Sequence, residues 1–486
     1  MYAQTRENVK SALKSAARVA LTCDSWTSRA TESYVTITAH FIDDRWKMNA
    51  YVLQTRAMHE SHTGAHMAEV LQRAAEEWGL TEKDPVVVTD NASNMTLAVE
   101  LTGFLHVRCF AHILNLASQR ALKLPAVARL LAKIRKISAF FHRSTTAAEA
   151  LKRNQMMLNL PHHKLITDVA VRWNSAYEML SRFLEQQPAI CAALLSPEVV
   201  KSVSDTCTLT EMEISNAEQV VQALKPMLVA TNVMCEEKTP TVSVIAPLQT
   251  QLLSDMSSTA KDSPLVKELK NAIFQDLSKR YNSSEKSNLY ISSALDPRFK
   301  SLLFLTPDEM NETFAKVVTK AAALQEAADL MDNRFQSTPP PDQEGSTMSA
   351  AEGKIDYTEP GEDLFTVHSP KRRKSALADL LGQTFNSSGT RTSTPSPASI
   401  AEQEMKRYQE APALPLTEDP LEWWKSQAHG YHLLSKLAQR YLCVPGTSVS
   451  AERMFSTAGD IISAQRSLLT SKHVDQLLFL KKNMHI

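Results

Sequence analysis

Alternating hydrophobic and polar positions predict several strands in the first quarter of the chain. Tyr34–Ile42 alternates with a period of two, as in a half-buried strand. Met48–Leu53 repeats this pattern more weakly after the turn-forming pair Asp43–Asp44, which predicts a hairpin. Residues 18–24 form a short apolar run, and Pro85–Asp90 is nearly continuous in apolar residues, as in a buried parallel strand. We expect a hairpin beside the first of these strands.

Helical periodicity enters at residue 63. Thr63–Gly79 carries an apolar stripe with a 3.6-residue period and ends in a glycine suited to a C-cap. A short helix at about 92–101, a strand at Leu105–Phe110 and a long helix at about 111–142 follow. Three strands followed by alternating helices and strands predict a mixed α/β fold.

Beyond this region the strand patterns give way to helical ones, and then to a polar segment. Residues from about 144 to 330 read as helices, with a turn at Ser293–Phe299. Residues of about 336–415 are rich in Pro, Ser, Thr, Gly and Glu, which leaves too little apolar surface to offset the entropy cost of ordering. We therefore predict a disordered linker there, with folded structure resuming at Leu421–Lys425.

Composition limits the classes of function. The formal net charge is zero at pH 7, so a surface for nucleic acid would have to be local. No run approaches the roughly 18 apolar residues of a membrane span, and we expect no membrane partner. The six cysteines are scattered without a Cys-x-x-Cys pair, which favours a reducing compartment, and we assign no zinc site.

Acidic residues end two of the predicted strands. If these strands are neighbours, Asp24 and Asp90 converge at one edge of the sheet, where a third carboxylate would complete a site for two divalent metal ions. Taken alone, Asp90 is more simply a helix N-cap. Glu452, which follows Ser448 and Ser450, is likewise more simply a first-turn residue that the helix dipole favours.

Motifs along the chain change this weighting. Ser450–Ser456 reads Ser-Ala-Glu-Arg-Met-Phe-Ser and precedes an Arg-x-x-Leu at Arg466–Leu469. This resembles the C-terminal dimerisation region of the hAT transposase superfamily. The family's Asp-x-Trp-Thr and Thr-Asp-x-x-x-Asn motifs are matched at Asp24 and Asp90. The resemblance covers about 18–300 and 418–483.

The resemblance implies an α/β ribonuclease H-like core interrupted by an all-α insertion, with a C-terminal helical hAT dimerisation region. The expected boundaries are 1–143 for the first part of the core, 144–335 for the all-helical insertion, 336–415 for the linker, and 416–486 for the dimerisation region with the end of the catalytic fold. The catalytic and metal-binding residues that it implies are Asp24, Asp90 and Glu452. Their cofactor would be Mg²⁺ or Mn²⁺ if the protein is catalytically active.

Two further motifs match the family. Cys109 and His112 form a Cys-x-x-His, which is half a zinc site at most. The residues favour packing at a strand–helix junction, whereas the family places this motif in support of the active site. Arg172 and Trp173 begin an Arg-Trp-x-Ser block, whose tryptophan in the family stacks on a displaced nucleotide. The alternative is that Trp173 is a core residue at the start of a helix.

Regions for self-association and nuclear import follow. The family's C-terminal helices form an intertwined dimer, whereas an ordinary interpretation buries their apolar faces within the monomer. The candidate dimerisation residues are Trp423, Trp424, Phe455, Leu477, Leu478 and Phe479. A basic cluster in the linker is either a nuclear import signal or a solvated run of charge, and consists of Lys371, Arg372, Arg373 and Lys374.

Complete hAT proteins usually begin with a BED zinc finger, and this sequence contains none. We therefore expect a truncated transposase, a fragment of a longer gene or a domesticated protein. The favoured hypothesis is a nuclear protein similar to the zinc-finger BED-domain family, which forms homodimers or higher oligomers, binds DNA, has nuclear protein partners and regulates transcription. The alternative is an active transposase that cuts and joins DNA strands with its Asp-Asp-Glu site.

Overall fold

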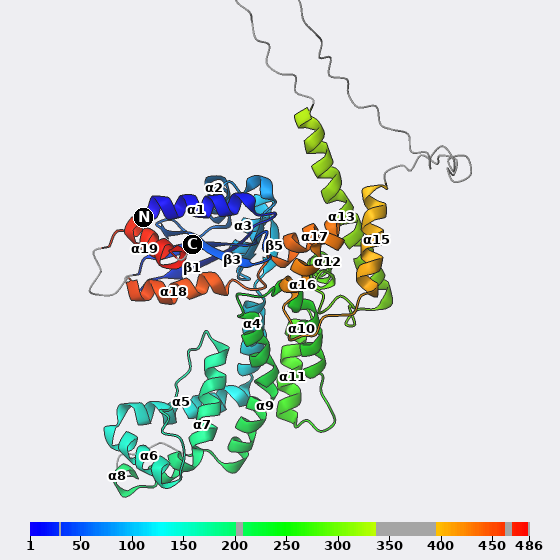
Figure 1. Ribbon diagram of the computed structural model, residues 1–486. Helices are drawn as coiled ribbons and strands as arrows, with labels where there is room; N and C mark the ends of the chain where they lie inside the picture. The colour runs from blue at the N-terminus through cyan, green and yellow to red at the C-terminus, as the bar shows by residue number, and fades with distance from the viewer. Residues whose placement is uncertain (29–30, 201–207, 337–394, 462–468, 485–486) are drawn as a thin grey trace, which may run out of the picture.

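A mixed five-stranded sheet forms one side of the molecule (Figure 1). The computed structural model describes residues 1–28, 31–200, 208–336, 395–461 and 469–484. In the order β3-β2-β1-β4-β5, the pairs β3–β2 and β2–β1 are antiparallel, whereas the pairs β1–β4 and β4–β5 are parallel. The strands are β1 (Ala20–Thr27), β2 (Ser33–Ile42), β3 (Met48–Met58), β4 (Val86–Thr89) and β5 (Leu105–Arg108).

The predicted hairpin is confirmed. β2 and β3 pair along their lengths, and the Trp46 N–H donates to the Asp43 carbonyl (2.9 Å) in the turn between them. The register of this pair shifts between Ile37 and Thr38, as at a β-bulge. The hairpin makes β3 an edge strand of the sheet.

Helices cover both faces of the sheet. The buried cluster on one face joins residues of β1–β4 to an N-terminal helix that the sequence did not predict, to the two helices that it did predict and to the last helix of the chain. These helices are α1 (Tyr2–Ser15), α2 (Gly64–Glu77), α3 (Ser93–Thr102) and α19 (Ser471–Asn483), with the short η1 (Thr81–Lys83) between α2 and β4. The other face packs against helices from later in the chain.

Side chains of α19 cover the edge strand. The Asn483 side chain accepts a hydrogen bond from the Val52 N–H (3.2 Å) and donates one to the Val52 carbonyl (2.8 Å). The Asp475 carboxylate accepts the Thr55 N–H (2.6 Å). Backbone groups that an edge strand ordinarily presents to solvent are thus satisfied by a helix from the far end of the chain.

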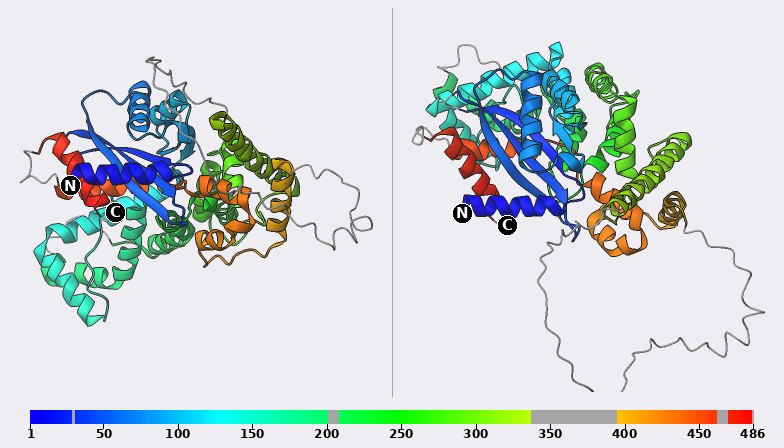
Figure 2. Two further views of the ribbon diagram at one scale, coloured as in Figure 1. Left: turned by 45° about the horizontal axis from the view of Figure 1, so that its top comes forward. Right: turned by 90° about the horizontal axis from the view of Figure 1, so that it is seen from above.

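The remaining elements among the described residues from 110 to 336 are all helices. Figure 1 shows α5–α8 as a lobe below the sheet and α10–α13 to its side, and Figure 2 shows the same division from two further directions. The helices are α4 (Phe110–Leu122), α5 (Pro125–Arg143), α6 (Thr145–Met157), α7 (Trp173–Leu194), α8 (Pro197–Val200), α9 (Glu211–Met234), α10 (Val242–Asp255), α11 (Pro264–Leu277), α12 (Ser283–Ala294) and α13 (Pro307–Gln336).

The prediction of one long helix over 111–142 was wrong. Two helices occupy this stretch, because Pro125 starts α5. Proline lacks the N–H that a helix interior needs, but it fits the first turn, where that N–H has no partner. The break lets α5 leave the direction of α4 and form part of the lower lobe (Figure 1).

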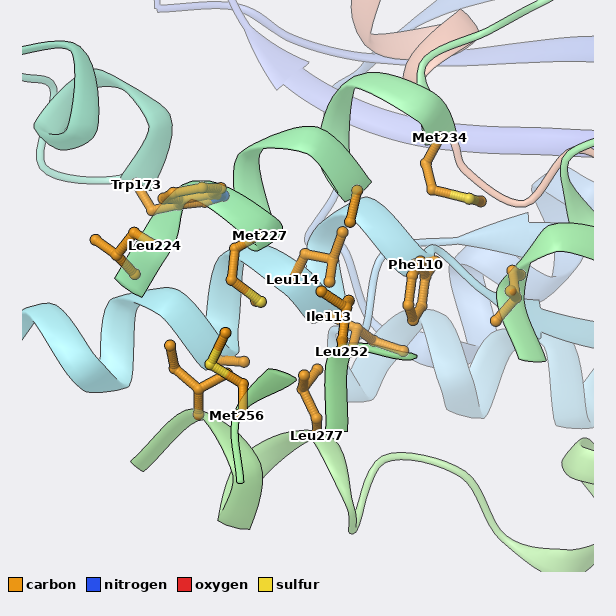
Figure 3. Close-up of a cluster of buried hydrophobic side chains, with 14 of the residues drawn as sticks. Phe110, Ile113, Leu114, Trp173, Leu224, Met227, Met234, Leu252, Met256 and Leu277 are labelled. Carbon is orange, nitrogen blue, oxygen red and sulfur yellow. The ribbon is translucent and has the colours of Figure 1, made fainter. Parts of the chain in front are cut away.

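The core of the helical part is continuous with the α4 side of the sheet. Figure 3 shows Phe110 and Leu114 of α4 in a buried cluster with Trp173, at the start of α7, and Met227 of α9. A side chain of α11, Leu277, closes the same cluster. This packing fixes the position of the helical part relative to the strands.

Part of the predicted linker is folded. The sequence predicted disorder over 336–415, but Pro397–Glu410 forms α15, capped by the Ser396 hydroxyl. Its buried Ala401, Met405 and Tyr408 recur at helical spacing and pack with α13 and α17. Ser396 and Pro397, which belong to the Pro- and Ser-rich composition that suggested a linker, begin this helix. Residues 337–394 lie outside the described part of the chain.

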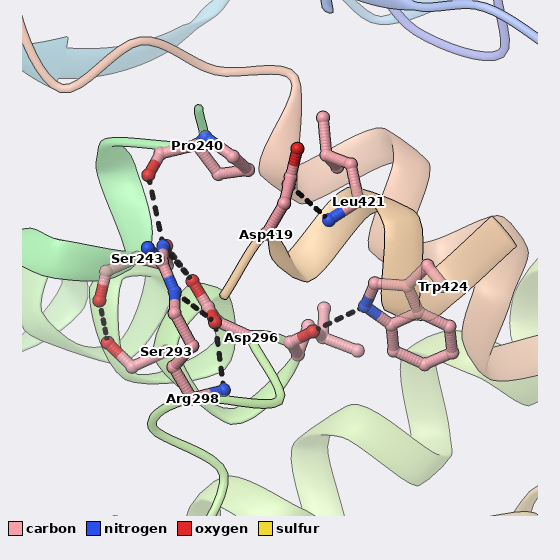
Figure 4. A network of polar contacts seen from close by, with 9 residues as sticks. Pro240, Ser243, Ser293, Asp296, Arg298, Asp419, Leu421 and Trp424 are labelled. Carbon is pink, nitrogen blue, oxygen red and sulfur yellow. Dashed lines mark hydrogen bonds and ion pairs between the residues drawn. The ribbon is translucent and has the colours of Figure 1, made fainter. Parts of the chain in front are cut away.

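The C-terminal helices close the structure against both parts. They are α16 (Pro420–Gln427), η2 (Ala428–Gly430), α17 (His432–Leu442), α18 (Val449–Ile461) and α19. Figure 4 shows Trp424 of α16 donating its indole N–H to the carbonyl of Leu295 (2.9 Å), beside a polar network on Asp296. No helix in the described ranges is long and apolar enough to cross a membrane.

Candidate active site

Two of the predicted acids come from neighbouring parallel strands. β1 pairs with β4 in a register that places Thr22 opposite Val88. Two residues further along each strand, Asp24 and Asp90 occupy equivalent positions on the same face, because side chains alternate with a period of two. The Asp24 carboxylate accepts the Ser25 N–H (2.8 Å). The predicted convergence of these two acids is therefore present.

Asp90 is not a helix N-cap. The N-cap of α3 is Ala92, whose N–H donates to the Asp90 carboxylate (3.2 Å) in a local turn. One Asp90 oxygen is thereby oriented by the backbone. The next residue, Asn91, carries a buried side-chain amide whose oxygen and nitrogen have no hydrogen-bond partner among the described residues. Such orphan polar groups are those that a bound ligand or water satisfies.

The third acid is delivered by the segment that leads into α18. The Phe110 N–H donates to the Gly446 carbonyl (2.9 Å), and the Gly446 N–H donates to the Thr241 hydroxyl (2.8 Å). A Cβ at position 446 would lie 2.3 Å from Met234 Cε and 3.0 Å from the Thr241 carbonyl oxygen, so a larger residue would require Met234 to move and would crowd the Thr241 backbone. α18 then packs across β1 and β2, with Glu452 in its first turn.

The start of α18 is held from two directions. The Arg453 guanidinium pairs with Glu237 (2.8 Å) and donates to the Cys235 carbonyl (2.9 Å), which follows α9. On the sheet side, the ring of Phe455 lies 5.7 Å from that of Trp26 in β1. These contacts from the helical part and from the strands fix the part of α18 that carries Glu452.

Electrostatics show that the three carboxyl groups affect one another. Burial, with repulsion from Glu452 and then Asp90, raises the pKa of Asp24 to about 8. Burial also raises the pKa of Glu452. The charge of Arg172 opposes this rise, whereas repulsion from Asp90 adds to it. Glu452 itself lies at the solvent-exposed rim of the site. The site therefore brings together carboxyl groups whose joint ionisation the protein's own cations do not fully offset.

The donor set suits a hard divalent cation, although the acids do not form a ready ligand shell. Among the described residues, no three His, Cys, Asp or Glu side chains are grouped closely enough to hold a metal ion. Asp24, Asp90 and Glu452 nevertheless supply only oxygen donors, and their mutual repulsion is the interaction that a divalent cation would relieve. Their chemistry fits Mg²⁺ or Mn²⁺, and the side chains would have to move to close around such an ion.

Cys109 and His112 lie beside the acids. Cys109 is fully buried at the junction of β5 and α4, where its sulfur accepts the Ser448 N–H (3.4 Å). Burial lowers the pKa of His112, which Asp90 partly opposes. The packing role that the residues favoured for Cys109 is what the structure shows, and His112 is close enough to Asp90 to interact with it electrostatically. Both residues therefore lie next to the candidate site, and their role there stays a prediction.

The predicted nucleotide-stacking residue is in the protein core. Trp173 is 2% exposed and packs among α4, α7 and α9 (Figure 3), so the alternative interpretation as a core residue is the one the structure supports. The backbone N–H of Trp173 donates to the side-chain oxygen of Asn115 (3.2 Å). In this conformation its ring has no face for a base, which corrects the assignment. Arg172, by contrast, is exposed and acts electrostatically on Glu452.

Three of the predicted dimerisation residues are covered within one copy of the chain. Trp424, Leu478 and Phe479 are all 0% exposed. The Phe479 ring packs against those of Tyr2 (5.1 Å) and Trp78 (6.0 Å), which belong to the N-terminal part of the fold. Direct contact of these three side chains with a second copy is therefore ruled out in this conformation, because the monomer core already occupies their surfaces.

The other dimerisation candidates keep some exposure. Leu477 is 39% exposed, whereas Trp423 and Phe455 are half-buried. The predicted import cluster, residues 371–374, lies outside the described residues. A feature that sequence reasoning missed is Asp168, which stands four residues before Arg172. Its carboxylate pairs with both ends of the Arg135 guanidinium (2.6 and 2.7 Å) and anchors the loop that carries Arg172.

The raised pKa of Asp24 predicts a pH-dependent effect of Asp24→Asn. Since the folded pKa of about 8 lies above the ordinary value of 3.8, folding favours the protonated carboxyl, and stability falls as pH rises from about 4 to about 8. The variant should match the wild type in thermal unfolding midpoint near pH 4 and exceed it near pH 8. One pKa unit corresponds to about 1.4 kcal/mol, so even part of the shift is measurable. An equal or lower midpoint of the variant at pH 8 would contradict it.

Family comparisons match three regions of the chain. The hAT family C-terminal dimerisation region matches residues 404–484. The ZBED1 RNase-like domain matches residues 22–112, which include the sheet, Asp24 and Asp90. The ZBED1 RNase-like helical domain matches residues 107–223, which run from α4 into α9. The match to the hAT dimerisation region therefore supports self-association of this protein.

Similar curated proteins include BED zinc-finger proteins and transposases. The chain is 26% identical to zinc finger BED domain-containing protein 4 of Homo sapiens, over 100% of this chain and 39% of that protein. It is 23% identical to a putative AC transposase of Zea mays, over 99% and 58%. It is also 23% identical to the putative transcriptional regulator tpeD of Talaromyces stipitatus, over 96% and 53%. The chain thus spans less than two thirds of each of these relatives.

The matched regions run in the family's order and contain all three acids, and the relatives align with nearly the whole chain. The chain is thus a hAT-derived protein, similar to the BED zinc-finger proteins and to the hAT transposases.

Proposed function

We propose that this protein is a nuclear DNA-binding protein that self-associates through its C-terminal region and regulates transcription. The relatives support this hypothesis, since they include a putative transcriptional regulator and BED zinc-finger proteins. The order and directions of the strands further support a ribonuclease H-like core that the helical part interrupts. The C-terminal match supports an oligomer as the working form.

The observation that carries DNA binding is the gathering of Asp24, Asp90 and Glu452 beside an exposed arginine. Two strands and a C-terminal helix bring the acids together, and the Arg135–Asp168 pair holds the loop on which Arg172 stands. Phosphates are bound by arginine directly, and by carboxylates only through a shared cation. The site therefore suits a DNA backbone in the presence of Mg²⁺ or Mn²⁺.

A DNA-binding measurement tests this proposal. Millimolar Mg²⁺ should raise the affinity of the wild type for a fluorescently labelled duplex by about fivefold or more, a usual size for coupling between two ligands. Asp90→Asn should abolish this gain, because it removes one carboxylate that would hold the cation. Asp44→Asn is the matched control, because Asp44 is an exposed acid in the β2–β3 turn. This variant should retain the gain in affinity with Mg²⁺. Failure of the folded wild type to bind DNA with or without Mg²⁺ would refute the proposed function.

Strand cutting is a second candidate, and the convergence of three acids favours it. Asp24, Asp90 and Glu452 would hold the cations, which supply an activated nucleophile and stabilise the leaving oxygen when bound. The chain's own contribution would be to orient these carboxylates and to place Arg172 beside the strand. Incubation of labelled duplex and pre-nicked hairpin DNA with Mg²⁺ or Mn²⁺ distinguishes the candidates. Nicking that Asp90→Asn abolishes supports cutting, whereas binding without nicking supports DNA binding alone.

A further inference from the structure

Two hollows lie side by side along α5. One is lined by Gln119, Lys123, Arg135 and Arg172 among others, with an empty volume of about 660 Å³. The other is lined by Arg135, Lys136, Ala139, Phe140, Arg143 and Ser144, with about 930 Å³. Both are lined by Arg135, where they adjoin, and we name the two hollows together the α5 groove.

Positive charge dominates the α5 groove. Its charged lining residues are Lys123, Arg135, Lys136, Arg143, Arg172 and Asp168. Five of these six are cations in a chain whose formal net charge is zero. The single carboxylate, Asp168, has both oxygens occupied by Arg135, so this pair contributes little net charge. With a net charge of zero, a surface for nucleic acid would have to be local, and the groove is such a local basic surface.

The other cations of the groove are available to a ligand. Lys123, Lys136 and Arg143 are exposed, and within the described ranges their side chains make no hydrogen bond or ion pair. Unpaired basic side chains on α5 and just before its first residue are suited to a partner with regularly spaced negative charges. A phosphate backbone has this property.

An aromatic ring lies among these cations. Phe140 is half-buried in the hollow that Lys136 and Arg143 also line, and its ring meets that of Phe141 edge-on (5.5 Å). Phe141 is buried and fixes this part of α5 to the core. Basic side chains beside a supported aromatic ring are the usual components of a surface for single-stranded nucleic acid.

One lining residue connects the groove with the candidate active site. Arg172 lines its inner end and is close enough to Glu452 to lower the pKa of that carboxyl. Figure 1 shows α5 in the lobe below the sheet, on the side where α18 lies. A strand whose backbone follows the groove would therefore lead to the three acids.

We propose that the α5 groove binds the sugar–phosphate backbone of an unpaired DNA strand and guides it to the Asp24–Asp90–Glu452 site. This inference rests on the proposed DNA-binding function and adds the surface and the form of DNA. Lys123, Lys136 and Arg143 contact phosphates, and Phe140 stacks on a base. An unpaired strand is favoured over a duplex because only an unpaired base exposes a face to Phe140.

The salt dependence of binding tests the cations. Affinity for a labelled single-stranded oligonucleotide should be measured by fluorescence anisotropy over a range of salt concentrations. Each phosphate contact adds about 0.7 to the slope of log affinity against log salt. Lys136→Ala/Arg143→Ala should therefore reduce this slope by about 1.4 and weaken binding about 25-fold at roughly 0.1 M salt. Lys267→Ala/Lys320→Ala, which removes two exposed lysines of α11 and α13, should change neither.

Phe140→Leu tests the stacking contact, because it keeps an apolar side chain at this position. It should weaken single-strand binding about fivefold or more and leave the salt slope unchanged. Equal losses in the groove variant and the lysine control would overturn the groove while leaving DNA binding intact. Wild-type protein that binds no DNA would overturn the proposed function as well. Wild-type binding of polyglutamate in preference to DNA would assign the groove to an acidic protein segment and overturn this proposal.

Discussion

Asp296→Ala should lower the free energy of unfolding by about 3–5 kcal/mol. Asp296 is 0% exposed and accepts hydrogen bonds from the Ser243 hydroxyl (2.7 Å) and from the Arg298 guanidinium (2.7 and 3.0 Å), as Figure 4 shows. Removal of the carboxylate leaves the largely buried Arg298 cation without its counter-charge, and uncompensated buried charges carry losses of this size. Chemical denaturation monitored by circular dichroism measures the change.

Asp44→Ala is the matched control for this prediction. Asp44 is exposed in the β2–β3 turn, so its removal should alter stability by no more than about 0.5 kcal/mol. Asp296→Asn serves as a second variant, because it keeps one oxygen as a hydrogen-bond acceptor but removes the negative charge. A loss below about 1 kcal/mol for both Asp296 variants would show that Arg298 finds other partners, such as the Pro240 carbonyl at 3.5 Å.

Trp424→Ala should cost a similar amount, about 3–5 kcal/mol, as is typical for the truncation of a fully buried aromatic side chain. The Trp424 ring stacks on those of Tyr408 (5.4 Å) and Trp46 (5.8 Å). It thereby joins α16 to α15 and to the β2–β3 turn, and its N–H satisfies the Leu295 carbonyl. The loss should appear in denaturation at protein concentrations where only monomer is present.

Trp423→Ala provides the comparison, because the adjacent indole is only half-buried and should cost less. The family resemblance alone placed both tryptophans at a dimer contact. If Trp424→Ala dissociated an oligomer at unchanged monomer stability, the residue would be an interface residue and its burial within one copy would be wrong. Since Leu295 and Asp296 are adjacent, the Trp424 and Asp296 variants should be combined in a double-mutant cycle.

The sequence was sufficient for the strands because their signals are local, whereas the acids needed the family motifs. Tyr34–Ile42 alternates cleanly, and Pro85–Asp90 is continuous in apolar residues, so each pattern matches the burial of its own strand. The convergence of Asp24 and Asp90 was predicted on the condition that their strands are neighbours, and the pairing of β1 with β4 meets that condition. Glu452 could be placed only through the family motif, because no local pattern shows that α18 returns to the sheet.

The failures share one physical cause, which is that burial depends on distant partners. Trp173 carries no local mark that distinguishes an exposed stacking ring from a core ring, and its surroundings come from α4 and α9. α15 was missed because its apolar positions are few and its partners, α13 and α17, are remote in sequence. α1, which the sequence did not predict, buries only Val9 and Leu13. The missed break between α4 and α5 has a different cause, because Pro125 is a local signal for it in the sequence.

The way in which α19 covers β3 has a consequence for the behaviour of the protein in a crowded cell. An open edge strand is a template to which extended segments of other chains can add, and this addition leads to aggregation. Here Asn483 occupies the backbone groups of Val52, and Asp475 places a carboxylate on Thr55. α19 therefore protects β3 against strand addition, and its removal is expected to expose these backbone groups and to promote aggregation.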